Sequence, residues 1–271
     1  MPLLRLPAPY DFALSTERFR AFGPDLANLW YDGALHRVVD GHEVRIEPAD
    51  GGVHVEPLDD TAEPVVRMLL GADFDLDGFA RFAAGDAVLR RIVPALAGLR
   101  PPLAPDPFES LVTSITAQQV SLRAAFAIRN RLIQLLGTPA LRAYAFPSKE
   151  RVASASPVSL REIGLSTRKA ENIVALARSD LDLDALSALS DEEVKSRLTA
   201  LPGIGEWTAD WFLARHLARP RAWPAGDLGL VKAVRAFYGG DGDVRAFGER
   251  FAPFQNLTAH YLLTALRMGF A

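Results

Sequence analysis

Residues 190–232 decide the fold, and they read SDEEVKSRLTALPGIGEWTADWFLARHLARPRAWPAGDLGLVK. Ser190 and Glu193 form a capping box, in which each side chain satisfies a backbone N–H of the first turn, so a helix is expected to begin here. Pro202 and Gly203 end it, because proline cannot donate to the helical ladder and glycine accepts positive φ without strain. A second helical pattern follows directly. The segment is therefore predicted to be a helix, a tight glycine turn and a second helix.

The glycines of this turn leave backbone N–H groups uncovered at the start of a helix, whose dipole adds partial positive charge. Such a turn is typical of a phosphate site. The alternative is a helical hairpin in which the turn only reverses the chain, and the turn by itself does not decide between the two. A phosphate site here would use residues Gly203, Ile204, Gly205 and Thr208.

Three further blocks accompany the hairpin. They read GDLGLVK at 226–232, DPFESLVTSITAQQVSLRAA at 106–125 and PYDFAL at 9–14. Together with LPGIGEWTADWF at 201–212, they resemble the helix-hairpin-helix DNA glycosylase superfamily with its Gly/Pro/Asp motif, and within it the bacterial 3-methyladenine DNA glycosylase II branch. The resemblance covers nearly the whole chain, and the paired blocks are far more specific than the hairpin alone.

Asp227 stands where the superfamily has its essential aspartate, with Leu230 and Lys232 in the expected register after it. Excision of a base passes through a state with oxocarbenium-like charge on the sugar, which one carboxylate can stabilise. The residues alone also predict an ordinary helix N-cap, because Gly226-Asp227 precedes an apolar helical pattern. The two roles are compatible, and the resemblance makes Asp227 the predicted catalytic residue.

Two tryptophans, Trp207 and Trp211, lie four residues apart and therefore on one helical face. Indole faces attract electron-poor alkylated bases by stacking and cation-π interaction, so this pair is predicted to wall the base pocket; packing in the core is the alternative. Phe12 is assigned to the mouth of the same pocket, again with a core role as the alternative. Superfamily members with lyase activity carry a lysine at the position of Trp207, so the resemblance implies a monofunctional enzyme that forms no Schiff base.

Gln118 and Gln119 interrupt the apolar pattern between two helical runs, which indicates an exposed junction. The resemblance places Gln119 at the wedge that fills the gap left by an extruded nucleotide, where relatives have an aliphatic residue, and Gln118 is the neighbouring candidate. A plain surface turn is the alternative.

Composition limits the chemistry. The chain of 271 residues has no cysteine, which excludes disulfides and an iron-sulfur cluster, and its five histidines show no ligand spacing. The resemblance implies at most a structural Na or K ion on hairpin backbone carbonyls and no other cofactor. A net charge of −3 opposes nonspecific DNA coating, so DNA binding needs a local basic face. The candidates for that face are Arg123, Arg129, Arg131, Arg161, Arg168, Lys169 and Lys232.

The first third of the chain differs from the rest. Alternating patterns separated by Asp40-Gly41 and Gly51-Gly52 predict an antiparallel sheet with covering helices, and the fold class is therefore α+β. A proline-rich stretch starting at Leu99 suggests domains at 1–98 and 99–271, the second all-helical with the hairpin at 191–217 and a catalytic loop at 218–227. Neither a signal peptide nor a membrane span is expected, which predicts a cytoplasmic protein. Nothing in the sequence demands more than a monomer, and a DNA-binding role implies association with the nucleoid.

The predicted activity is hydrolysis of the N-glycosidic bond of alkylated bases in double-stranded DNA, leaving an abasic site for base excision repair. One alternative is a noncatalytic protein of the same fold that binds damaged DNA. A second is a helical interaction protein unrelated to nucleic acid. Residue types do not rank the alkylated bases.

Overall fold

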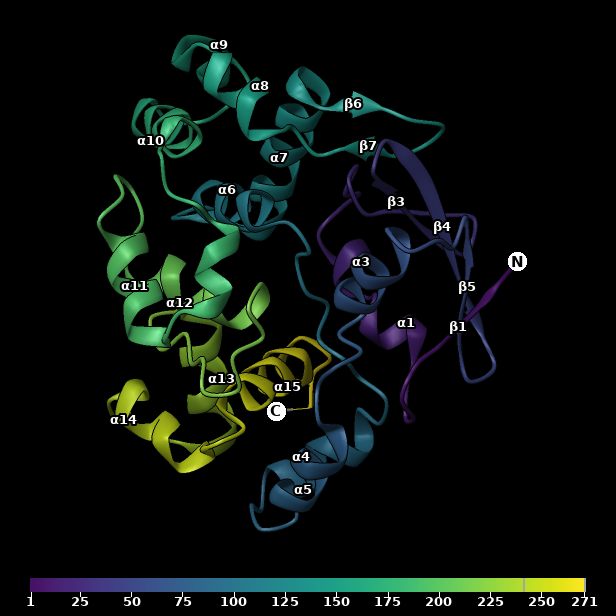
Figure 1. Cartoon of the computed structure of the whole chain (residues 1–271). Coiled ribbons are helices and arrows are strands. Elements are labelled where there is room, and N and C mark those ends of the chain that lie inside the picture. The colour runs from purple at the N-terminus through teal and green to yellow at the C-terminus, as the bar shows by residue number, and fades with distance from the viewer. Residues whose placement is uncertain (241, 271) are drawn as a thin grey trace.

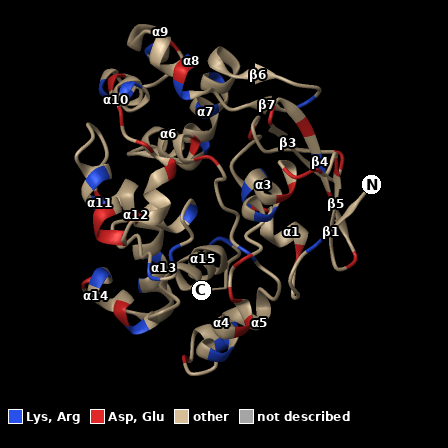
Figure 2. Ribbon diagram, in the orientation of Figure 1, with Lys and Arg blue, Asp and Glu red and all other residues tan. Residues whose placement is uncertain are grey.

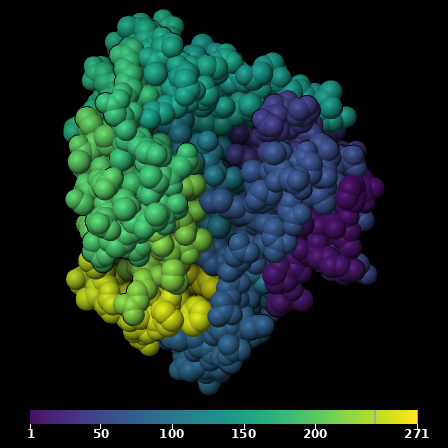
Figure 3. Space-filling model, viewed as in Figure 1, coloured from purple at the N-terminus to yellow at the C-terminus, as the bar shows by residue number. Residues whose placement is uncertain are grey.

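Three hydrophobic cores organise the chain, which the computed structural model describes for residues 1–240 and 242–270 (Figure 1). The first core lies under an N-terminal sheet, the second within the helices of the middle of the chain, and the third joins two helices from residues 76–95 to the C-terminal helices. Figure 3 shows the purple-to-blue N-terminal residues on one side of the molecule and the green-to-yellow helices on the other.

The N-terminal sheet is antiparallel, with strand order β1-β5-β4-β3-β2. Its strands are β1 (Leu3–Arg5), β2 (Leu29–Tyr31), β3 (Ala34–Val39), β4 (His42–Ala49) and β5 (Gly52–Glu56). The predicted hairpins are present, because Val39 pairs with His42 and Ala49 with Gly52. Helices α1 (Phe12–Ser15), α2 (Arg18–Ala21) and α3 (Ala62–Leu69) contribute to the core with the buried face of the sheet. The predicted α+β class is confirmed.

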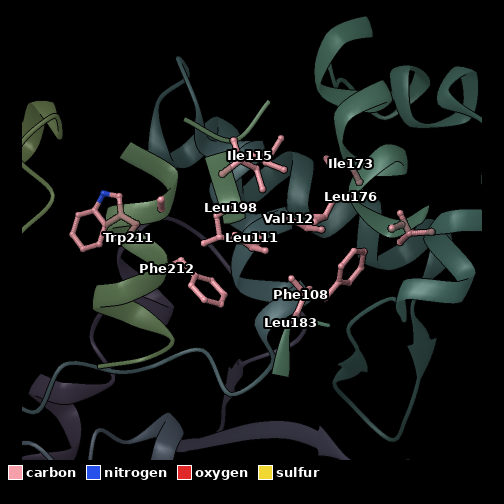
Figure 4. Close-up of a cluster of buried hydrophobic side chains, with 14 of the residues drawn as sticks. Phe108, Leu111, Val112, Ile115, Ile173, Leu176, Leu183, Leu198, Trp211 and Phe212 are labelled. Carbon is pink, nitrogen blue, oxygen red and sulfur yellow. The ribbon is translucent and has the colours of Figure 1, made fainter. Parts of the chain in front are cut away.

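The middle core consists of helices, of which all except the 3-10 turn η1 were expected from the sequence. They are α6 (Pro107–Ala117), α7 (Leu122–Leu136), α8 (Lys149–Ser154), α9 (Pro157–Glu162), α10 (Thr167–Arg178), η1 (Asp184–Ala188), α11 (Asp191–Thr199) and α12 (Glu206–Arg215). Figure 4 shows Phe212 of α12 beside Leu111 and Leu198, whereas Trp211 lies at the edge of this cluster. A short hairpin, β6 (Thr138–Pro139) and β7 (Tyr144–Ala145), was not expected from the sequence.

The third core corrects the expected domain boundary. Its elements are α4 (Leu76–Ala83), α5 (Leu89–Ala95), α13 (Leu228–Tyr238), α14 (Val244–Gly248), η2 (Glu249–Phe251) and α15 (Gln255–Arg267). Phe79 and Leu89 pack with Tyr261 and Leu262 in one buried cluster. A boundary at residue 99 cuts through this core, because residues 76–99 pack with the C-terminal helices and not with the sheet.

A buried ion network joins the sheet to α6 and α7. Glu109 of α6 accepts from Arg37 of β3 at 2.7 Å and from Arg129 of α7 at 2.6 Å, and Arg129 also pairs with Asp25 at 3.2 Å. Burial raises the pKa of Glu109, but the two guanidinium groups outweigh it and lower that pKa to about 2. Arg129 therefore serves the interior, and its assignment to a basic DNA-binding face was wrong.

Charged residues are distributed over the whole molecule (Figure 2). Of the predicted basic residues, five are exposed, namely Arg123, Arg131, Arg161, Arg168 and Lys232, whereas Lys169 donates to the carbonyls of Thr116 and Gln118. Across the described residues, no helix combines the length and the apolar character that a membrane crossing requires.

Candidate active site

A cavity of about 830 Å³ brings the sequence-predicted site together. Its lining comes from the α6–α7 junction, the start and the inner face of α12, the start of α13, and the facing parts of α2 and α15. The lining includes Asp227, Trp207, Trp211, Gln119 and Gly205, which are distant in sequence. The helical hairpin and the two glutamines therefore belong to one site, as predicted.

Asp227 is held by three N–H donors. Its Oδ1 accepts from the backbone N–H of Leu230 at 3.0 Å, so it is the N-cap of α13 as the sequence predicted. Its Oδ2 accepts from the indole Nε1 of Trp207 at 3.1 Å and of Trp211 at 3.0 Å. A carboxylate with this many donors has little freedom to rotate.

The two tryptophans differ in what they offer to a base. Trp211 is only 1% exposed, and the guanidinium carbon of Arg215 lies 3.5 Å from its ring centroid, so one indole face is already covered. Trp207 is half-buried and borders the cavity. We conclude that Trp207 has the ring surface available for stacking, whereas Trp211 chiefly orients Asp227.

Phe12 does not belong to this cavity. It is buried in the N-terminal core at 6% exposure, with its ring centroid 5.6 Å from that of Trp30. Phe12 was predicted to line the mouth of the pocket, but it is a core aromatic, which was the alternative. Its ring packs in the hydrophobic core on the apolar face of the sheet. Leu14 and Ser15 of the same short helix border the cavity instead.

The two glutamines have separate roles. Gln119 is exposed and has a φ of +55°, a left-handed conformation that is uncommon outside glycine and often marks a functional position. Gln118 is half-buried, and its amide Nε2 donates to the carbonyl of Gly203 and to Oγ1 of Thr208, both at 3.0 Å. Gln118 is therefore a strut between the junction and the hairpin and is not free to act as a wedge.

Of the two glycines in this turn, only Gly205 has open space beside its backbone for an approaching ligand. Gly205 is exposed, and a Cβ built there would meet nothing within 4 Å. Gly203 has a φ of +79° and faces inward, where an added Cβ would lie 2.0 Å from Nδ2 of Asn172. The assignment of Thr208 as a phosphate ligand was wrong, because its backbone N–H donates to Gly205 O at 3.0 Å and its hydroxyl is buried.

Sequence reasoning missed the basic side of the cavity, which comprises Arg18, Arg215, His260 and Arg267. One signal was available, since Arg215 follows Trp211 by four residues and must share its helical face. Burial, together with repulsion from Arg267, lowers the pKa of Arg18 to about 10. Burial and the nearby Arg215 hold the pKa of His260 well below its usual range, so this imidazole is neutral at pH 7.

Comparison with known proteins agrees with this geometry. The family model for the HhH-GPD superfamily base excision DNA repair protein matches residues 112–251, just over half of the chain. The DNA-3-methyladenine glycosylase 2 of Escherichia coli is 30% identical over 83% of this chain and 79% of its own length. The DNA-3-methyladenine glycosylase of Bacillus subtilis is 30% identical over 60% of this chain, which spans 56% of that protein. The solved structure of 3-methyladenine DNA-glycosylase from Archaeoglobus fulgidus superposes with a TM-score of 0.90 over 100% of both chains, at 29% identity.

Proposed function

Because the chain belongs to the HhH-GPD superfamily of base excision DNA repair proteins, and within it to the 3-methyladenine DNA glycosylase II branch, we propose that it hydrolyses the N-glycosidic bond of alkylated bases in double-stranded DNA. The observation that carries this proposal is the carboxylate of Asp227, which three N–H donors fix at the wall of a cavity large enough for a base.

The chemistry follows from that carboxylate. As the bond between C1′ and the base breaks, positive charge develops on the sugar, and a fixed carboxylate stabilises that charge without reorganising. Water adds to C1′ and loses a proton, which passes to solvent when the base was cationic and leaves neutral, and which the base takes up when it was neutral and leaves as an anion. The N-terminus of α13 fixes the position of the Asp227 side chain during this step, since Oδ1 accepts from the Leu230 N–H.

We further propose that the enzyme has no lyase activity. Strand cleavage through a Schiff base requires an amine that reaches C1′. Trp207 stands where superfamily members with lyase activity carry a lysine, its indole lies 3.1 Å from Asp227, and the lining contributed by the described residues includes no lysine.

DNA binding is assigned to the hairpin and the junction. The open backbone at Gly205, at the start of a ten-residue helix that has no side-chain cap, suits a DNA phosphate. Gln119, which projects from the junction beside the exposed Val120 and Leu122, is proposed as the wedge. A monovalent cation on the hairpin carbonyls, a monomeric state and a location at the nucleoid stay predictions.

The proposal is tested by incubating the protein with methylated double-stranded DNA and identifying the released bases by chromatography. Abasic sites are scored by alkali treatment, and strand breaks are scored without it. We expect released alkylated bases, alkali-sensitive sites in equal number, and no adduct after borohydride reduction. Binding of methylated DNA without base release would favour the noncatalytic damage-binding alternative.

A further inference from the structure

The inner wall of the cavity carries two guanidinium groups that the reaction proposed above does not use. Arg18 of α2 and Arg215 of α12 border both the large cavity and a second one of about 70 Å³ behind it. Arg129 and Arg267 also border the large cavity, but each has carboxylate partners: Asp25 and Glu109 for Arg129, Glu17 for Arg267. Arg18 and Arg215 have no comparable ion pair within residues 1–240 and 242–270.

Two unpaired nitrogen atoms belong to side chains of the same wall. The Nε of Arg215 is buried without an acceptor in the described chain, while the guanidinium plane stacks on Trp211. The Nε2 of His260 is likewise buried and unpartnered there, and this ring meets Trp211 edge-on at 5.7 Å between centroids. Buried polar groups are nearly always hydrogen-bonded, so unpaired ones that face a cavity indicate a missing ligand.

The charge of the wall limits what that ligand is. Glu17 neutralises Arg267, and the ion network neutralises Arg129, which leaves Asp227 as the one carboxylate set against Arg18 and Arg215. Burial, with repulsion from Arg18, lowers the pKa of Arg215, yet a guanidinium stays protonated at neutral pH. The cavity wall therefore has an excess of positive charge, and arginine offers only donors.

We propose that Arg215 and Arg18, with His260 beside them, are the groups that recognise a neutral damaged base through its carbonyl oxygen or unprotonated ring nitrogen, whereas release of a cationic base does not depend on them. This inference rests on the proposed glycosylase function and concerns the substrate class of the same site. It differs from the sequence-based expectation, in which indole faces attract cationic bases, because Arg215 already covers one face of Trp211.

The two classes of base also need different help to leave. When C1′–N breaks, the bonding electron pair goes to the base, so a cationic base departs neutral and a neutral base departs as an anion until it takes the proton lost by water. Donation from Arg215 or Arg18 to the acceptor on the base stabilises that anion. Removing these donors should therefore slow excision of neutral bases selectively.

The test compares two substrates, a duplex with a single hypoxanthine, which is neutral and has a carbonyl oxygen, and methylated DNA that contains cationic 3-methyladenine. Single-turnover release is measured for the wild type, Arg215→Met and Arg18→Met. Methionine keeps apolar length over Trp211 and removes charge and donors. We expect each variant to release hypoxanthine about 10- to 100-fold more slowly, because a hydrogen bond from a charged group is lost. Each variant should release 3-methyladenine at a rate within about threefold of the wild-type rate.

Arg178→Met is the matched control, since that guanidinium lies outside both cavities and donates to Ala153 O. It should change neither rate. Equal slowing on both substrates by Arg215→Met and Arg18→Met, or weaker binding of both DNAs, would overturn the selectivity and assign the arginines to support of Trp211 or to the DNA backbone. Because Arg18 is on another helix, its variant decides the matter if Arg215→Met does not fold. A wild type that releases neither base refutes the proposed function and not this inference alone.

Discussion

Replacing Trp211 with phenylalanine removes one of the two indole donors to Asp227 and keeps an aromatic ring in the core. The lost contact is the 3.0 Å hydrogen bond from Nε1 to Oδ2. A hydrogen bond to a charged group contributes about 1.5–3 kcal/mol, and about 1.4 kcal/mol corresponds to a tenfold change in rate. Trp207 still donates to the same oxygen at 3.1 Å, so we expect the lower end of this range, a drop of about tenfold in single-turnover base release.

The pair of indoles allows a sharper measurement. Trp207→Phe should also cost about tenfold, and the double variant about 100-fold, if both donors act by orienting the carboxylate. In an Asp227→Asn background, Trp211→Phe should have little further effect, because the group that it orients no longer carries charge. DNA affinity should change little in these variants, which separates the effect from substrate binding.

Trp223→Phe is the control, because its indole donates to Val244 O at 2.8 Å and its ring packs in the third core away from the cavity. It should lower the melting temperature without a specific loss of base release. Wild-type rates in Trp211→Phe and Trp207→Phe, measured on folded proteins, would refute the reasoning that the indole donors orient Asp227.

Gln119→Ala should slow base release by about tenfold, because the wedge that stabilises the extruded nucleotide is lost. Gln118→Ala should also lower thermal stability, because it removes the hydrogen bonds that join the junction to the hairpin. The native pKa of Glu109 lies below its unfolded value of 4.5, so its contribution to stability is complete above about pH 4.5 and disappears as the pH falls toward 2. Denaturant unfolding measures the free energy of unfolding at pH 7 and at pH 3. Between these two pH values Glu109→Gln should lose less of this free energy than the wild type, because the variant is already destabilised by about 3 kcal/mol at pH 7. Gly203→Ala should lower the free energy of unfolding by about 1–2 kcal/mol, because alanine is strained at this positive φ and its Cβ clashes with Asn172. Adding Asn172→Ala to the same chain should relieve the clash but not the backbone strain, and calorimetry measures the stability of both variants.

The helical part of the fold was predictable because its signals are local. The capping box at Ser190 and Glu193, the glycine turn and the N-cap at Asp227 each act within four residues, and each is present in the structure. The turns of the sheet were predictable for the same reason, because Asp40-Gly41 and Gly51-Gly52 are local signals for β-hairpins. Local patterns could not show which elements share a core, and so residues 76–98 were placed with the wrong unit.

The site was predictable in its catalytic half. Asp227, Trp207 and Gln119 were found through motifs that keep their spacing along the chain, and the structure brings them to one cavity. The basic half was missed because Arg18 and Arg215 lie 197 positions apart and meet only through packing of α2 against the cavity. Phe12 was misplaced for a related reason, since an aromatic near a motif looks the same whether it faces the sheet or the pocket.

The account depends most directly on Asp227. Single-turnover base release from methylated duplex DNA, with wild type and Asp227→Asn compared at matched fold and DNA affinity, tests it in one experiment. Asparagine keeps the size of the side chain and removes the charge, and its one oxygen can accept either from Leu230 or from the two indoles, but not from both sides. The account predicts that release falls by at least about 100-fold, as expected when a preorganised electrostatic group is lost. Unchanged release in Asp227→Asn would contradict it and would leave Asp227 only as the cap of α13.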